Sequence, residues 1–222
     1  MDEILRLIRT DLRRSMDGII SKSMRDKGLD YKLNFGVNTV RLQSLAQRYE
    51  PGVALAEMLW KQETRELKIL ATMLFPIEEF TPEHAERWAT EIHNQEIREQ
   101  VCVNLFQELG FADKLVAGWI NSEDEETRTT GYWLLARLIL RKSELVDSID
   151  IASTIDSAIS DLDSQSYFLR NAAQNALKFM GRTSTEISRQ ILDGIGDFGS
   201  SEDPLKKEIY DSLTFEFSEF GS

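Results

Sequence analysis

The chain has 222 residues, of which 41% are apolar, enough for a substantial core and too many for a disordered protein. Its formal net charge is −12, from 26 basic and 38 acidic side chains. Residues 1–50 hold 10 Lys and Arg against 7 Asp and Glu, a net of +3, whereas residues 51–222 hold 16 against 31, a net of −15. An acidic body disfavours a general nucleic-acid binder, because phosphate binding requires clustered Lys and Arg, but it leaves room for a local basic strip.

The scarcity of Cys and His excludes several kinds of site. A single cysteine, Cys102, excludes an internal disulfide, and its apolar neighbours predict a buried thiol in a protein of a reducing compartment. His84 and His93 have no Cys or carboxylate at ligand spacing, so we predict no metal site. There is no Gly-rich phosphate loop, nucleophile elbow or paired-carboxylate motif, and we expect no cofactor.

The hydropathy of the chain predicts a cytoplasmic protein. The first residues, MDEILRLIRTDLRR, begin with acids and contain no long apolar run, which argues against a signal peptide. No segment approaches the about 20 uninterrupted apolar residues that a membrane span requires.

Short amphipathic helices recur along the first half of the chain. Thr39 is the expected N-cap of one helix, and Thr81 that of another. Between Leu59 and Leu74, apolar residues at i, i+3, i+4 and i+7 predict a helix that folds back on the one before it. The opposite face of this helix is expected to carry Arg65, Glu66 and Lys68. The predicted helices are 4–12, 16–25, 40–49, 53–60, 67–74, 82–92 and 95–109.

The second half of the chain continues the pattern. Ser122 with Glu125, and Thr183 with Glu186, have the spacing of capping boxes. The helix that follows Ser122 is apolar on much of its circumference, which predicts a buried position. The predicted helices are 115–120, 123–140, 149–162, 167–180, 184–192 and 205–213, and residues 214–222 are expected to form a C-terminal tail that either docks or frays.

These patterns predict an all-α protein, because no stretch alternates at the period of a strand. Tryptophans recur near the ends of short helices, at residues 60, 88 and 119. Helix pairs at such intervals predict an α-α superhelix, a HEAT- or armadillo-like solenoid of antiparallel helix pairs. We expect a single domain over residues 1–213, with N-terminal helices in 1–32 and repeats in 36–195. The alternative is a compact helical bundle.

Three groups of residues, in this order, resemble the bacterial DNA alkylation repair family, the AlkD-like glycosylases. They are Gly36-Val37-Asn38-Thr39 with Arg41-Leu42, Leu59-Trp60 with Arg65-Glu66, and Trp119-Ile120 leading through Ser122 to Arg128. The resemblance spans about residues 33–195. It implies a HEAT-like solenoid whose concave face holds duplex DNA by its backbone. In active members it also implies excision of cationic alkylated purines, assisted by aromatic side chains and an aspartate.

Residue by residue, the family's catalytic positions are changed in this sequence. The tryptophan and aspartate that begin the helix at Gln95 are read here as Glu96 and Gln100. A second tryptophan corresponds to Asn175 and a nearby arginine to Lys178. A fixed carboxylate would stabilise the oxocarbenium-like sugar, and aromatic faces would attract the cationic base. Gln100 and Asn175 supply neither.

Three hypotheses follow from this comparison. In the first, the chain keeps the scaffold, lacks the standard glycosylase site and binds DNA through Arg98, Arg128, Arg170 and Lys178, unless these pair with nearby acids instead. In the second, a displaced glycosylase site uses Glu96 and Trp133, although all four tryptophans fit core anchors. In the third, an acidic scaffold binds a basic protein partner. The sequence does not predict the oligomeric state.

Overall fold

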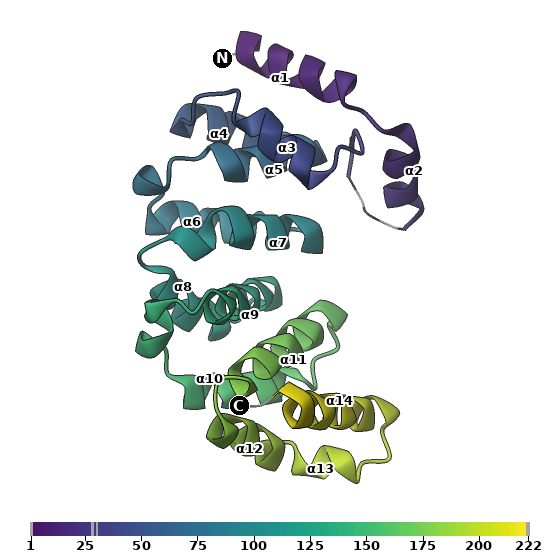
Figure 1. Cartoon of the computed structure of the whole chain (residues 1–222), viewed down its shortest axis with the longest axis vertical. Helices are drawn as coiled ribbons and strands as arrows, with labels where there is room; N and C mark the ends of the chain where they lie inside the picture. Colours follow the sequence, from purple (N-terminus) through teal and green to yellow (C-terminus); the bar gives the residue numbers. More distant parts are fainter. Residues whose placement is uncertain (1, 28, 30, 221–222) are drawn as a thin grey trace. The chain divides into compact units, whose positions relative to one another are not determined.

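The computed structural model describes residues 2–27, 29 and 31–220. Its regular elements are helical (Figure 1), and within these residues the only β pairing is an isolated bridge between Leu33 and Thr64. Helix packing divides the chain into two compact units, Met1–Leu109 and Gly110–Ser222. The prediction of an all-α fold is confirmed.

The first unit is a stack of short helices. Helix α4 folds back on α5, and α5 also packs against α3 and α7. Each helix pair therefore contacts its sequence neighbours, as expected for helical repeats. The elements are α1 (Asp2–Arg14), α2 (Gly18–Asp26), α3 (Thr39–Ala46), α4 (Val53–Trp60), α5 (Arg65–Leu74), η1 (Ile77–Glu79), α6 (Pro82–Thr90), α7 (Gln95–Asn104) and η2 (Phe106–Glu108).

Helix α5 is buried on almost every side. Arg65, Glu66 and Lys68, which we predicted to lie opposite the apolar stripe, are also withdrawn from solvent. Arg65 and Glu66 are only 2% and 0% exposed, and Lys68 is half-buried. The reason is the packing of α5 among α3, α4 and α7.

The N-terminal helix α1 is part of the first unit. Its Ile8 and Leu12 are fully buried. Asp11 accepts a hydrogen bond from the Tyr49 hydroxyl (2.9 Å) and forms an ion pair with Arg48 (2.9 Å). Burial, and then the nearby Asp11 carboxylate, raise the pKa of Tyr49 to about 12.

Three of the four tryptophans are core residues, as predicted. Trp60 and Trp88 stack with ring centroids 4.0 Å apart, and their indole N–H groups donate to Glu91 and Glu57 respectively. Trp119 is 2% exposed. Paired burial of large rings with satisfied N–H groups stabilises the stack.

The second unit is built around α9 and α11. Helix α9 packs against α8 and α11, and α10 packs on α11. The elements are α8 (Ala112–Ile120), α9 (Glu125–Leu140), η3 (Glu144–Ser148), α10 (Ile151–Asp161), α11 (Tyr167–Gly181), α12 (Thr185–Gly194), α13 (Gly196–Gly199) and α14 (Pro204–Phe220).

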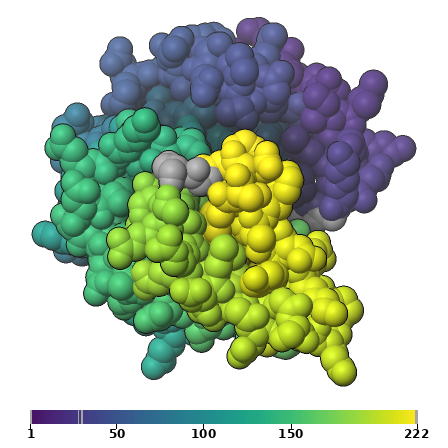
Figure 2. Space-filling model, turned by 60° about the horizontal axis from the view of Figure 1, so that its bottom comes forward, coloured from purple at the N-terminus to yellow at the C-terminus, as the bar shows by residue number. Residues whose placement is uncertain are grey.

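The C-terminal segment corrects one expectation. Residues 214–220 are not a tail but continue α14, which packs against α11 and α12. In Figure 2 the yellow atoms of the C-terminal segment lie against the yellow-green atoms of the residues before it. A Cβ on Gly181 would overlap the ring of Phe217, so this glycine is the point of close approach. Arg182 Nε donates to Glu216 (2.6 Å). These contacts extend the helix beyond Leu213. Residues 221–222 of the predicted tail lie outside the described residues.

Most helix starts lie within two or three residues of prediction, but several caps differ. Thr81 caps α6 as predicted. The caps predicted at Thr39, Ser122 and Thr183 lie one or two residues away, because neighbouring side chains accept the N–H group that each cap must satisfy. The observed capping residues are Asn38, Asp124 and Ser184.

Candidate functional site

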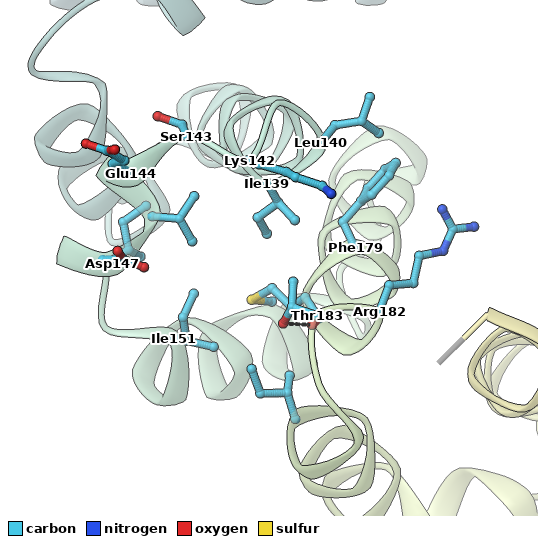
Figure 3. Close-up of a pocket in the computed structure, with 14 residues that line it drawn as sticks. Ile139, Leu140, Lys142, Ser143, Glu144, Asp147, Ile151, Phe179, Arg182 and Thr183 are labelled. Carbon is cyan, nitrogen blue, oxygen red and sulfur yellow. Dashed lines mark hydrogen bonds between the residues drawn. The ribbon is translucent and has the colours of Figure 1, made fainter. Parts of the chain in front are cut away.

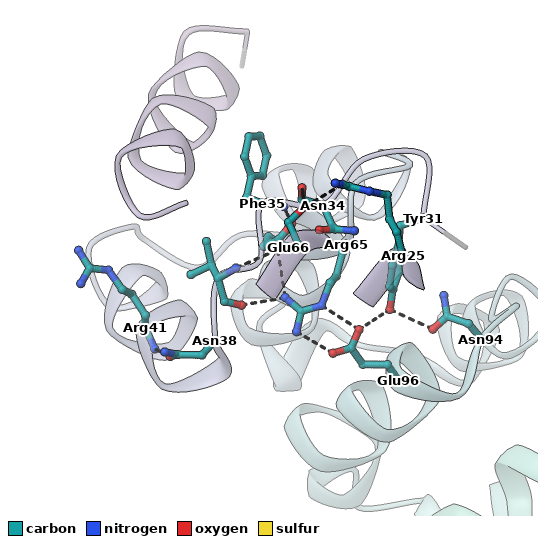
Figure 4. A network of polar contacts seen from close by, with 12 residues as sticks. Arg25, Tyr31, Asn34, Phe35, Asn38, Arg41, Arg65, Glu66, Asn94 and Glu96 are labelled. Carbon is teal, nitrogen blue, oxygen red and sulfur yellow. Dashed lines mark hydrogen bonds and ion pairs between the residues drawn. The ribbon is translucent and has the colours of Figure 1, made fainter. Parts of the chain in front are cut away.

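Glu96, a candidate catalytic residue, lies in the first turn of α7. Asn94 caps this helix by accepting the Ile97 N–H (2.9 Å). The Glu96 carboxylate accepts hydrogen bonds from Arg65 Nε (2.8 Å) and Nη2 (2.6 Å), and from the Tyr31 hydroxyl (2.6 Å). Figure 4 shows Glu96 between these two donors. Both of its oxygens are therefore engaged in the fold.

The electrostatics of this cluster keep Glu96 ionised. Burial alone would raise the pKa of the Glu96 carboxyl, but hydrogen bonds from Arg65 and Tyr31, with the charge of Arg65, lower it below its ordinary value. Burial, and then the hydrogen bond to Glu96, raise the pKa of Tyr31, which therefore remains a hydrogen-bond donor. Glu96 is a fixed anion whose charge is compensated locally.

Arg65 and Glu66 extend the cluster into the core. Glu66 accepts the backbone N–H groups of Phe35 (3.0 Å) and Val37 (3.2 Å) and is 3.0 Å from Arg65 Nη1. Arg65 Nη1 also donates to the Val37 carbonyl (2.8 Å). The two side chains fasten the segment between α2 and α3 to α5 and α7 (Figure 4). The Arg65-Glu66 pair is thus a structural clamp.

The other candidates on α7 differ in how far they are buried. Arg98 is 1% exposed and its Nη1 donates to Gln95 Oε1 (2.8 Å). The guanidinium of Arg98 therefore lies in the core of the first unit, where its phosphate contact stays a prediction. Gln100, which we read as the counterpart of the family's aspartate, is half-buried and accepts a hydrogen bond from Asn104 Nδ2 (3.3 Å).

In the second unit, Arg128 is bound to nearby oxygens. Its Nε is 3.2 Å from Asp161, and its Nη1 donates to the carbonyls of Ser122 (2.9 Å) and Glu123 (3.2 Å). Asp161 also accepts from the Tyr132 hydroxyl (2.9 Å). The alternative that Arg128 pairs with nearby acids is the arrangement observed. Its side chain is 19% exposed.

Trp133 lies on the same helix, partly buried. Its Nε1–H is buried and has no hydrogen-bond partner within residues 2–27, 29 and 31–220. Trp133 belongs to the second unit, whereas Glu96 belongs to the first.

Two predicted cations do line one groove. Arg170 and Lys178, both on α11, face α14 across a groove of about 350 Å³. Arg170 Nη1 donates to the Ser164 carbonyl (2.6 Å), and Lys178 has no ion-pair partner in the described part of the chain. Asn175, at the family's second tryptophan position, is half-buried on this helix.

A larger cavity in the second unit contains none of the predicted site residues. It measures about 850 Å³ and lies where the ends of α9 and α11 meet η3 and α10. Ile139 and Ile151 contribute to its apolar wall, while Lys142, Arg182 and Glu144 are polar groups that also line it (Figure 3).

The described residues contain neither a metal-binding cluster nor a membrane-spanning helix. Over residues 2–27, 29 and 31–220, no cluster of three or more His, Cys, Asp or Glu side chains could hold a metal ion. In the same residues, no helix is long and apolar enough to cross a bilayer.

The sequence reasoning missed Tyr31 and the aromatic pair Tyr167 and Phe168. Tyr31 precedes the first family-like segment, and only the contact with α7 shows its role. Tyr167 and Phe168 begin α11 outside its buried stripe of small residues, and they are 65% and 45% exposed. Two adjacent aromatic residues off the apolar face are the signal that could have identified them.

The fold and these clusters define an all-helical protein of HEAT-like repeats. The profile of the family described as "DNA alkylation repair enzyme" matches residues 8–197. The chain belongs to this DNA alkylation repair family.

One solved structure shares the fold over nearly the whole chain. A protein from "a new family of proteins related to the HEAT-like repeat DNA glycosylases with affinity for branched DNA structures" superposes with a TM-score of 0.78 at 16% identity, over 97% of this chain and 95% of that one. The designed armadillo repeat protein YIII(Dq)4CqI is also similar, with a TM-score of 0.46 at 12% identity, over 81% of this chain and 87% of that one. No curated protein matches the chain significantly.

Proposed function

We propose that this chain is a DNA-binding member of the alkylation repair family that holds DNA by its backbone and lacks the standard glycosylase site. The observation that carries the proposal is the state of Glu96. Arg65 and Tyr31 bind both of its oxygens, so its carboxylate is not available to a sugar cation.

The neighbouring family positions support the same conclusion. Gln100 carries no charge, and Asn175 has no aromatic face with which to bind a cationic purine. A glycosylase would need both groups held in a defined geometry, because such sites tolerate little displacement. In this proposal the chain retains the helical repeats of the family but has different side chains at the positions that carry out the glycosylase reaction.

Support for DNA binding comes from family membership and from α11. Lys178 has no ion-pair partner among the described residues, and Arg170 engages a single carbonyl with one of its donors. Free donors of this kind bind phosphate oxygens without reading sequence. A structurally similar protein is described as having affinity for branched DNA, which makes branched DNA a substrate to test beside linear duplex.

The test is a titration of labelled linear and branched DNA at several salt concentrations, followed by fluorescence anisotropy. We expect affinity to fall as salt rises, and Lys178→Glu to weaken binding and reduce the slope of log K against log salt by about 0.9 for the lost phosphate contact. Lys207→Glu is the matched control, because Lys207 is an exposed lysine of α14 that does not line the groove.

The other hypotheses predict different results. Release of an alkylated purine that Glu96→Gln abolishes would establish the displaced glycosylase site. Absence of binding to either DNA at low salt, together with binding of a basic peptide, would establish the acidic scaffold instead. Both outcomes contradict the proposed function.

A further inference from the structure

The groove between α11 and α14 has the chemical composition of a nucleotide site. Its α11 wall contains Tyr167, Arg170, Asn171, Gln174 and Lys178, and Glu208 projects from the α14 wall. The volume, about 350 Å³, lies at the lower end of the range for small-molecule pockets. A groove of this size can hold one flat group such as a nucleobase, but it is too small to bind the surface of another protein.

Tyr167 offers a prepared surface for stacking. It is 65% exposed at the first position of α11, and Phe168 lies beside it with ring centroids 5.6 Å apart and planes at 73°. An edge-to-face pair covers at most one face of either ring, so ring surface remains available to a ligand. The neighbouring ring also restricts the orientation of Tyr167, which reduces the entropy lost on binding.

The polar side chains lie along one face of α11. Tyr167, Asn171, Gln174 and Lys178 follow one another at helical spacing, so an aromatic group, two amides and a cation are arranged along a line. Arg170 donates once to the Ser164 carbonyl, and a guanidinium has five N–H groups, so it keeps donors for a phosphate.

The acid opposite them fits the same kind of ligand. Glu208 is an acceptor, and the exocyclic amino groups of cytosine and adenine are donors that carboxylates recognise. Two cations against one acid leave the groove with a net positive lining. A basic peptide would meet repulsion from Arg170 and Lys178, whereas a phosphate would meet attraction.

From these observations we infer that the groove binds an unpaired nucleotide of a DNA strand, as found at a branch point, flap or gap. Tyr167 stacks on the base, Arg170 and Lys178 hold flanking phosphates, and the amides with Glu208 contact the base edge. A base inside an intact duplex is stacked on its neighbours and cannot reach Tyr167. The inference rests on the proposed function and adds the DNA structure that is preferred.

The experiment compares a fully paired duplex with a duplex of equal length that carries a short flap containing 2-aminopurine. We expect Tyr167→Ala to weaken binding of the flap DNA about tenfold, the loss of one stacked base, with no effect on the paired duplex. Binding of the unmodified protein should quench 2-aminopurine, and Tyr167→Ala should abolish this quenching. Tyr167→Trp should retain both properties.

Phe215→Ala is the matched control, because Phe215 is an aromatic residue of α14, 63% exposed, that does not line the groove. It should change neither affinity nor quenching. Equal losses on both DNAs, or no loss with Tyr167→Ala, would overturn the nucleotide site and leave the proposed function intact. If the unmodified protein bound neither DNA, both the proposed function and this inference would be wrong.

Discussion

Replacement of Glu66 by alanine should strongly destabilise the first unit. Glu66 is 0% exposed and satisfies the N–H groups of Phe35 and Val37 as well as one nitrogen of Arg65. Each buried N–H left without a partner costs about 1–3 kcal/mol. In this variant Arg65 still donates hydrogen bonds to the Glu96 carboxylate and the Val37 carbonyl, so its buried charge remains paired. We therefore expect a loss of about 3–5 kcal/mol, a large part of the about 5–15 kcal/mol that stabilises a typical domain.

The assay is urea unfolding followed by far-UV circular dichroism, together with amide hydrogen exchange at Phe35 and Val37. Glu66→Gln retains one acceptor and should lose about half as much as Glu66→Ala. The control is Glu63→Ala, since the ion pair of Glu63 with Lys32 is on the surface and its loss should leave the midpoint unchanged. A loss below about 1 kcal/mol for Glu66→Ala, or unchanged exchange at the two amides, would refute the clamp.

Three further predictions concern single positions. Gly36 has a φ of 70°, and a Cβ there would overlap backbone atoms, so Gly36→Ala should lower the urea midpoint far more than the control Gly118→Ala, whose Cβ meets open space. In Gly181→Ala the added methyl would overlap the ring of Phe217, and this overpacking should weaken the docking of α14 by about 1–3 kcal/mol. Limited proteolysis should then cut α14 faster, and the smaller side chain of Phe217→Leu should restore protection. Because folding lowers the pKa of Glu96 from the ordinary 4.5, its contribution to stability is complete above that pH and is lost as pH falls below it. The free energy of unfolding of Glu96→Gln should accordingly vary less with pH between about 5 and 3, as measured by urea titrations across that range.

The fold could be predicted because its signals are local. Helical periodicity, caps such as Thr81 and the spacing of tryptophans each lie within a few residues. The extent of α14 could not be predicted in this way. The helix continues through Phe220 because Phe217 packs on Gly181 and Glu216 accepts a hydrogen bond from Arg182, and both contacts join residues distant in sequence.

The candidate site was predicted less well because its contacts are distant in sequence. Glu96 bonds to Arg65 and Tyr31, which are 31 and 65 residues away. The packing of α5 against α7 brings Arg65 to Glu96, and the segment between α2 and α3 adds Tyr31. The sequence also does not show whether a basic residue on a helix is buried or exposed. Arg98 lies in the core, whereas Lys178 lines a groove.

We propose that the chain holds DNA without excising alkylated bases. A single-turnover reaction tests this: saturating protein is incubated with alkylated duplex, and bound DNA and released purine are measured in the same sample. We expect salt-sensitive binding, with release no faster than in a sample without protein. Release above that rate, abolished by Glu96→Gln while the protein remains folded and bound to DNA, would contradict it.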